Sequence, residues 1–564
     1  WRIESGRLQA SNADAHGEAM FGLDLAAGHR PRLRLLADIR DGVAAHASRY
    51  IPLQRMPEPL TAWFGHAFSG GEVSRGRFLY EGAVGIEPDR QQDRTFQMTF
   101  TVDDFGLRFL TDWPQVEALQ GTVLVDGVTV HGRDLSGRFL GADISAADVD
   151  VLGTTPGGQP RVTVAGAVQG PLSALQTLLQ ETPVQGQLPE EIADWQVQGG
   201  ALQGQLDLSI PLAAHSPPLQ VEAQAAVEAG TLHNPARRLT VNALQGEGRF
   251  SLNEGLHFPA LSARLFDAPV TASVNSDTRH THLDIRGAMA MVRLRDWLRM
   301  PWLAALEGRT DYRARLRLPR RADAGAPRLT VDTDLSGVSV GLPPPLGKTA
   351  ANRQRLQLVL EGGDANRLSL SMPPLMSARL EYDGDGLTRG GLRFGEREAG
   401  LPPSGLLIDG RTGVLDLGAW LGVLLGPDTE GPAAQLPPVR LALDTDQLLL
   451  LNEPLGPASF SARQSGGGWS LALASEPLAG EVRVPAGYAL RGEQPMQLDI
   501  DRLRWPLTAP LPPDADGPSA AQRVVEAAAE LAGDQTGELV SSLVLSPDPS
   551  RIPVADIRAA DVSL

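Results

Sequence analysis

The chain has 564 residues, a formal net charge of −17 and no cysteine. Because its negative charge repels a phosphate backbone, nucleic acid is not an expected partner. The lack of cysteine excludes disulfides, thiolate metal sites and a cysteine nucleophile. The longest apolar run, residues 417–426, is about half as long as a bilayer span requires, so this segment is not expected to cross a membrane.

The first structural signal is a period-two alternation of apolar and polar residues. In chain order, clear examples are residues 72–80, 95–102, 202–210, 329–340 and 496–503. Such runs would show one apolar and one polar face when extended, which is typical of half-buried strands. Gly, Pro, Asn or Asp separates most of them, as short hairpins require. The sequence therefore predicts a mainly β, antiparallel fold.

The alternation is clearest between Ala243 and Asn275. Three short runs there are separated by turn residues at 253–255 and 267–269. This stretch predicts an antiparallel meander with a single apolar face.

Helical spacing of apolar residues occurs in only a few short places. The patterns start near residues 57, 171, 292 and 418. Their spacing predicts a repeat of roughly 120 residues, each with one short helix followed by several strands. A further helix is expected after residue 518, in a segment rich in alanine.

The sequence similarity between residues 135–144 and 261–270 supports a repeat of this length. Six segments follow from it. They are strands of a truncated repeat (1–56), four β-groove repeats (57–170, 171–291, 292–417 and 418–505), and a Pro-rich insert (506–564) that contains a helix at 519–532 and the start of a further repeat.

Candidate chemical sites are weak. Residues 347–349 end like a phosphate loop but lack its first glycine. His280 and His282 share one face of a strand, but no third metal ligand has a fixed spacing, which favours a solvated polar face. Asp383 begins like a calcium loop, yet Phe394 stands where the closing glutamate belongs, so a hairpin turn is expected. The sequence therefore predicts no catalytic residue, no metal site and no cofactor.

The apolar face of so many strands requires a cover, and the helices are too few and too short to supply it. Two alternatives remain open. The faces are buried against one another in a closed sandwich or solenoid, or they form an open aliphatic trough suited to acyl chains. The expected lining residues are Phe250, Leu252, Leu261, Leu265, Val270, Val274, Leu316, Leu318, Val331, Leu335, Leu356, Leu358, Leu360, Leu368, Leu370 and Met372. We expect no protein surface to cover this face completely.

Several short motifs occur in an order that resembles the AsmA-like family of bacterial envelope proteins. They include Tyr50-Ile-Pro52, Leu60-Thr-Ala-Trp-Phe64, Phe109-Leu-Thr-Asp-Trp-Pro114, Gly248-Arg-Phe250, Val340-Gly-Leu-Pro-Pro-Pro-Leu-Gly-Lys-Thr349 and Asp416-Leu-Gly-Ala-Trp-Leu421. The resemblance implies an elongated, curved antiparallel sheet that forms a hydrophobic groove from tandem repeats, with a few short crossing helices.

The resemblance also implies a function. The chain would be the periplasmic part of a Gram-negative protein anchored in the inner membrane. Its groove would be a non-enzymatic conduit that binds phospholipid acyl chains and moves phospholipid between the inner and outer membranes. Contacts with both membranes would use segments outside this chain, and other envelope proteins are possible partners. The alternative is an envelope scaffold or interaction protein with a closed core.

Overall fold

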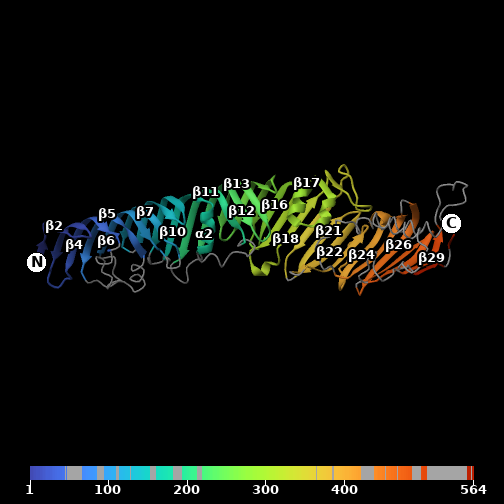
Figure 1. The fold of residues 1–564 in the computed structure, drawn as a ribbon. Coiled ribbons are helices and arrows are strands. Elements are labelled where there is room, and N and C mark those ends of the chain that lie inside the picture. The colour runs from blue at the N-terminus through green and yellow to red at the C-terminus, as the bar shows by residue number, and fades with distance from the viewer. Residues whose placement is uncertain are drawn as a thin grey trace. The chain divides into compact units, whose positions relative to one another are not determined.

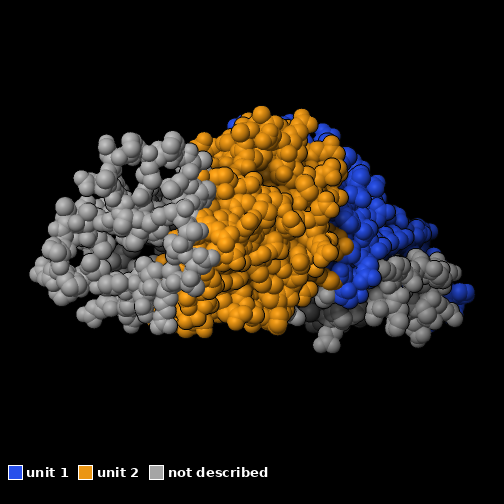
Figure 2. Space-filling model, turned by 90° about the vertical axis from the view of Figure 1, so that its right-hand side faces the viewer, with its two compact units in different colours: residues 1–283, 319–324 blue, residues 284–318, 325–564 orange. Residues whose placement is uncertain are grey.

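The computed structural model divides the chain into two compact units, which are coloured separately in Figure 2. Unit 1 comprises residues 1–283 and 319–324, and unit 2 comprises residues 284–318 and 325–564. The structure describes residues 1–44, 46, 67–84, 94–109, 113–127, 129–152, 160–181, 194–211, 219–363, 365–383, 386–420, 437–450, 453–466, 468–485, 497–504, 556–559 and 562–563.

Unit 1 is built almost entirely from strands that follow one another in chain order (Figure 1). Its elements are β1 (Arg2–Glu4), β2 (Leu8–Ser11), β3 (His16–Asp24), β4 (Arg32–Val43), β5 (Phe68–Ala83), β6 (Arg94–Leu107), β7 (Val116–Asp126), β8 (Thr129–Phe139), β9 (Ala142–Leu152), β10 (Arg161–Pro171), α2 (Ser173–Glu181), β11 (Gln196–Pro211), β12 (Gln220–Asn234), β13 (Leu239–Ser251), β14 (Gly255–Leu265), β15 (Ala268–Ser276) and the 3-10 helix η6 (Ala322–Ala324).

Unit 2 has the same character, and β16 (His280–Ala290) and β17 (Leu306–Pro319) contain residues of both units. Its other elements are α4 (Met291–Leu298), the 3-10 helix η5 (Pro301–Ala305), β18 (Arg328–Thr333), β19 (Val338–Val340), β20 (Leu356–Glu361), β21 (Asn366–Met372), β22 (Met376–Asp383), β23 (Gly386–Phe394), β24 (Gly405–Asp416), β25 (Val439–Leu450), β26 (Glu453–Ser465), β27 (Gly468–Ser475), β28 (Leu478–Val484), β29 (Gln497–Arg504), β30 (Asp556–Ala559) and β31 (Val562–Ser563).

The strands of unit 1 form antiparallel ladders. From β3 to β15 each strand pairs with the next, and β1 and β2 both pair with β3. No pairing among the described residues joins β15 to β1, β2 or β3, so this sheet is open. The predicted mainly β, antiparallel fold is confirmed.

The predicted meander corresponds to β13, β14 and β15. Phe250 lies opposite Leu256 across the first turn, and Leu265 lies opposite Ala268 across the second. Phe266 and Asp267 form the second turn with φ values of 51° and 62°. Positive φ at both central residues defines the tight type I′ hairpin, whose twist matches that of the flanking strands.

The helices lie close to their predicted starts. α2 begins at Ser173, α4 begins at Met291 and residues 417–420 are helical. The predicted helix near residue 57 and the predicted helix at 519–532 lie outside the described residues. The repeat boundaries stay a prediction.

Unit 2 departs from the antiparallel expectation at three places. β23 pairs with β24, β24 pairs with β25, and β29 pairs with both β30 and β31, all in parallel. Parallel neighbours need a connection that returns the chain to the starting end of the previous strand. Residues 395–404 make this return between β23 and β24. Alternation within a strand carries no information about such a return.

Gly410 on β24 is required by the parallel junction. Its φ is 115°, and a Cβ atom at this position would lie 2.2 Å from the Phe394 carbonyl oxygen. We therefore expect Gly410→Ala to lower the free energy of unfolding by about 1–3 kcal/mol, measured by urea denaturation. Gly413 is the matched control, because a Cβ there would meet no atom within 4 Å. Equal stability losses in the two variants would contradict the junction's role.

The buried core consists of small local clusters. In unit 1, Val102 and Phe105 form a cluster with Ala44. In unit 2, Met291 of α4 packs with Leu335 and Val338. These clusters form where helices and connections meet the apolar face of the sheet, and most of the other apolar side chains on the strands are half-buried.

No helix among the described residues is long and apolar enough to cross a membrane.

Candidate functional site

The apolar face of unit 2 carries a continuous row of side chains on successive strands. Each member is the register partner of the next, and directly opposed residues project from the same face of a sheet. All members are aliphatic, so the row is pure hydrocarbon. We call it the unit-2 row, and its members are Ala314, Val331, Leu358, Leu370, Ala378, Leu392, Ile408, Leu441, Ala462, Leu471, Val482 and Leu498.

Unit 1 has an equivalent feature, which we call the unit-1 row. It extends from β4 to β12, and its members are Ile39, Gly76, Phe100, Val123, Gly132, Val149, Val164, Leu208 and Val221. At its two glycine positions neighbouring apolar side chains occupy the space of a side chain. A Cβ atom at Gly76 would lie 3.3 Å from the Phe100 ring, and one at Gly132 would lie 2.7 Å from Leu135 Cδ1.

The larger members of both rows are half-buried. Neighbours within a single sheet cover the flanks of an aliphatic side chain but leave its tip exposed. A tip that remains exposed is available to an apolar ligand, and covering it contributes roughly 25 cal/mol per Å².

The structure places the predicted lining residues on these apolar faces, in two settings. Val331, Leu358 and Leu370 belong to the unit-2 row. Leu360 and Leu368 are register partners of each other and lie beside this row. Half-buried members of the predicted set also include Phe250, Leu252, Leu261, Leu265, Leu316, Leu318, Leu356 and Met372.

Three predicted lining residues are instead buried by protein. Val270 is 6% exposed, and Val274 and Leu335 are each 8% exposed. The expectation that no protein surface covers this face completely is wrong at these positions. Leu335 packs with Met291 and Val338, and the half-buried Leu356 and Met372 pack against the same cluster.

Sequence reasoning missed several members of the rows, including Ile408, Leu441, Leu471 and Val482. Alternation marks the strands of Leu441, Leu471 and Val482, so a signal was present there. What it lacked was the register, which decides which alternating residues line up between strands.

The opposite face of unit 2 carries charge. Arg315 Nη2 lies 2.8 Å from Asp332 Oδ2, and Glu381 accepts hydrogen bonds from Arg389 at 2.6 Å and Arg367 at 2.9 Å. The hydrogen bond from Arg389, followed by that from Arg367, lowers the pKa of the Glu381 carboxyl. Glu381 itself is buried beneath these arginines, whereas the Arg315 and Arg367 side chains are more than half exposed. The charged face is therefore the aqueous side of the sheet, and the other face is apolar.

The Lys348 side chain forms hydrogen bonds with main-chain carbonyl groups. Its Nζ donates hydrogen bonds to the carbonyl oxygens of Leu335 at 2.9 Å, Thr349 at 3.2 Å and Val338. Burial lowers the pKa of the Lys348 ammonium. Because carbonyls occupy its donors, Lys348 fixes the loop at 341–349.

This loop lies against the apolar face of unit 2. Leu346 packs on the cluster that contains Met376 and Phe394. Trp420 Nε1 donates a 2.8 Å hydrogen bond to the Pro344 carbonyl oxygen, which holds the loop from the helical turn at 417–420. Asp383 and Gly386 are register partners at the ends of β22 and β23, so the segment that resembled a calcium loop connects a hairpin.

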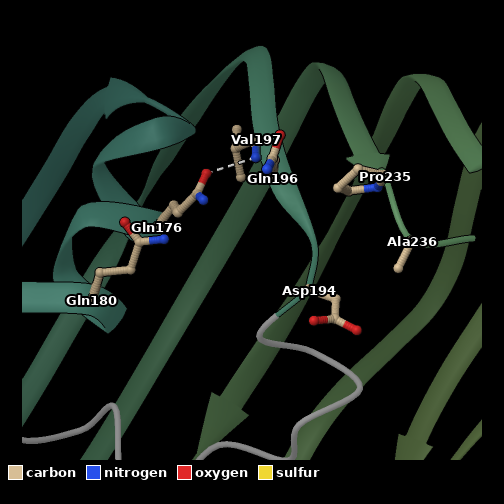
Figure 3. A pocket seen from close by; sticks show the side chains of 7 residues that line it. All are labelled: Gln176, Gln180, Asp194, Gln196, Val197, Pro235 and Ala236. Atoms are coloured by element: carbon tan, nitrogen blue, oxygen red, sulfur yellow. Dashed lines mark hydrogen bonds between the residues drawn. The ribbon is translucent and has the colours of Figure 1, made fainter. Parts of the chain in front are cut away.

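A cleft of about 500 Å³ lies beside α2 in unit 1 (Figure 3). Its wall is mainly polar, and Gln176 Oε1 accepts a 2.6 Å hydrogen bond from the Val197 N–H. None of the lining residues is basic, so the cleft offers no cation to a phosphate. The lining residues are Gln176, Gln180, Asp194, Gln196, Val197, Pro235 and Ala236.

Sheets with one polar face and one face of half-buried apolar rows are typical of proteins that present extended hydrocarbon surfaces. The chain belongs to the YhdP protein family, whose family model matches residues 1–564. This match confirms the resemblance found in the sequence.

One curated relative is similar to the chain. It is the intermembrane phospholipid transporter YhdP of Escherichia coli (strain K12), which is 22% identical over 374 residues. The matched region covers 64% of this chain and 28% of that protein, so it spans less than a third of the relative's length. No solved structure matches the chain.

Proposed function

We propose that this chain is a periplasmic segment of a lipid conduit that moves phospholipid between the inner and outer membranes. The observation that carries the proposal is the pair of apolar rows, one in each unit. The Escherichia coli relative, named as an intermembrane phospholipid transporter, supports the choice of cargo.

The mechanism requires no reacting group. Acyl chains lie along the half-exposed rows, while the charged headgroup stays in water at the edge of the apolar face. Burial of each CH₂ contributes about 0.8 kcal/mol, so a lipid is held firmly in total. The lining of unit 2 changes little from strand to strand, because each position of the row offers another aliphatic side chain. A lipid therefore slides with small changes in free energy.

Partners of this chain follow from the proposal. Phospholipid acyl chains are the ligand, and both membranes would be reached through other segments of the longer protein. A passive surface has no preferred direction, so direction comes from an envelope partner or from a lipid gradient. The conduit is non-enzymatic and uses no cofactor.

The alternative is an envelope scaffold whose apolar faces are buried in a closed core. A closed sandwich needs a second sheet facing the first at about 10 Å. In the described part of each unit, the pairings connect the strands to their ladder neighbours and form an open series. This arrangement favours the open apolar face.

Site-specific photocrosslinking tests the proposal. A photoreactive amino acid replaces Leu265 or Leu358 on the apolar face, and Arg264 or Gln357 on the opposite face serves as the matched neighbour. We expect lipid adducts, detected by mass spectrometry after expression in the envelope, at the two leucine positions in at least about tenfold excess over their controls. Equal labelling of both faces would overturn the conduit.

A further inference from the structure

Three potential ligand side chains converge at the start of β16 in unit 1. Asp277, His280 and His282 each offer one atom, and these three atoms all lie within 4.8 Å of one another. His280 and His282 are two residues apart on one strand, so they project from the same face. Asp277 lies in the turn after β15, which brings its carboxylate back to the histidines. The spacing of residues in the sequence did not identify Asp277 as the third ligand, because a turn brings it to the histidines.

The first histidine is already oriented for metal binding. His280 Nε2 lies 3.0 Å from the Ala324 carbonyl oxygen. A carbonyl can only accept, so Nε2 carries a proton, and in the neutral ring this leaves the Nδ1 lone pair for a metal. Metal-binding histidines commonly donate the other ring N–H to such a carbonyl, which fixes the ring and its tautomer.

The carboxylate is also held in place. Asp277 Oδ1 accepts the backbone N–H groups of Arg279 and His280, both at 2.7 Å, and Asp277 Oδ2 lies 2.9 Å from His282 Nε2. Arg320 Nη1 donates to the main-chain oxygen of Asp277 at 2.6 Å. That bond steadies the turn, while Asp277 Oδ2 faces His282 and Oδ1 lies 4.0 Å from His280 Nδ1.

We propose that Asp277, His280 and His282 bind a divalent transition-metal ion of the Zn²⁺ class. Two imidazole nitrogens and one carboxylate oxygen are a donor set that zinc prefers, with bonds of about 2.0–2.2 Å. Tetrahedral geometry then places the donor atoms about 3.3 Å apart. The ligand atoms lie within 4.8 Å of one another, so side-chain movements of no more than about 1.5 Å close the site. Water completes the coordination.

Bound metal would connect the turn after β15 to the first strand residues of β16. Because the two histidines and Asp284 alternate with Thr281 and Leu283, the ion lies on the charged face, away from the apolar surface. The site is therefore a local clamp between the end of β15 and the start of β16, and it is independent of lipid binding. The competing interpretation is a simple ion pair between His282 and Asp277 without metal.

Isothermal titration calorimetry separates these interpretations. In this experiment ZnCl₂ is titrated into the full chain, which is purified without a polyhistidine tag. We expect one saturable site, which His282→Asn, His280→Asn or Asp277→Asn each weakens at least about tenfold. Zn²⁺ should also raise the melting temperature of the wild-type chain more than that of each variant.

His131→Asn is the matched control. His131 Nδ1 lies 2.6 Å from Asp150 Oδ1, which reproduces a histidine–aspartate pair at a place where no three-ligand group occurs among the described residues. This variant should bind Zn²⁺ like the wild type. Absence of saturable binding by the wild type below about 100 μM, or equal affinity in the wild type and His282→Asn, would overturn the metal site.

Discussion

Replacement of Leu358 by aspartate is expected to reduce the lipid that co-purifies with the protein at least about tenfold. Leu358 lies in the unit-2 row between its register partners Val331 and Leu370. A carboxylate at this point contacts acyl chains and loses part of its hydration, which costs several kcal/mol. Each 1.4 kcal/mol corresponds to about a tenfold change in occupancy. Lipid extracted from the purified protein and quantified by mass spectrometry measures the effect.

Val359→Asp is the matched control for this variant. Val359 is the next residue on β20 and lies opposite Thr330 and Ser369, on the face that carries the ion pairs. The substitution introduces the same charge into the same strand on the aqueous side. We expect this variant to retain lipid like the wild type. If both variants lost lipid equally, the loss would reflect damage to β20, and the assignment of the apolar face would be wrong.

Truncation of Leu448 to alanine is expected to cause the largest loss of stability in unit 2. Leu448 is 0% exposed and packs in one cluster with Leu415, Leu450 and Leu455. Removal of its side chain forfeits hydrophobic burial and leaves a cavity, so the free energy of unfolding should fall by about 2–5 kcal/mol. Urea denaturation of the full chain, monitored by tryptophan fluorescence, measures the change in the unfolding transition of unit 2.

Leu441→Ala on the same strand is the comparison. Leu441 belongs to the unit-2 row and is half-buried. Its truncation removes fewer protein contacts, so we expect a loss of about 1–2 kcal/mol together with reduced lipid retention. Equal destabilisation by the two substitutions would show that the row is packed as tightly as the core, which contradicts an open apolar face.

The period-two alternation was sufficient to predict the strands and their apolar faces. It placed Val331, Leu358 and Leu370 on one surface, and the structure aligns the three as register partners. This prediction works because the side chains of an extended backbone alternate strictly, whatever the strand's neighbours are. The short helices at Ser173 and Met291 followed from an equally local period of 3.6 residues.

Other features depended on contacts between residues far apart in the chain. Ile408 and Leu441 line up because two parallel pairings bring β23, β24 and β25 together, and no pattern within one strand predicts that return. Leu335 is buried because Met291 and Val338 cover it. The Asp277 carboxylate meets His280 and His282 only because a turn folds back.

The sequence by itself determined that this protein is made mainly of antiparallel strands with one apolar face and one polar face. The tertiary structure decided which aliphatic residues line up into rows, which of them other segments cover, and where a third polar ligand approaches the histidine pair. The physical reason is that side-chain alternation is a property of the local backbone. Register, crossing connections and burial arise from the free energy of contacts between distant segments.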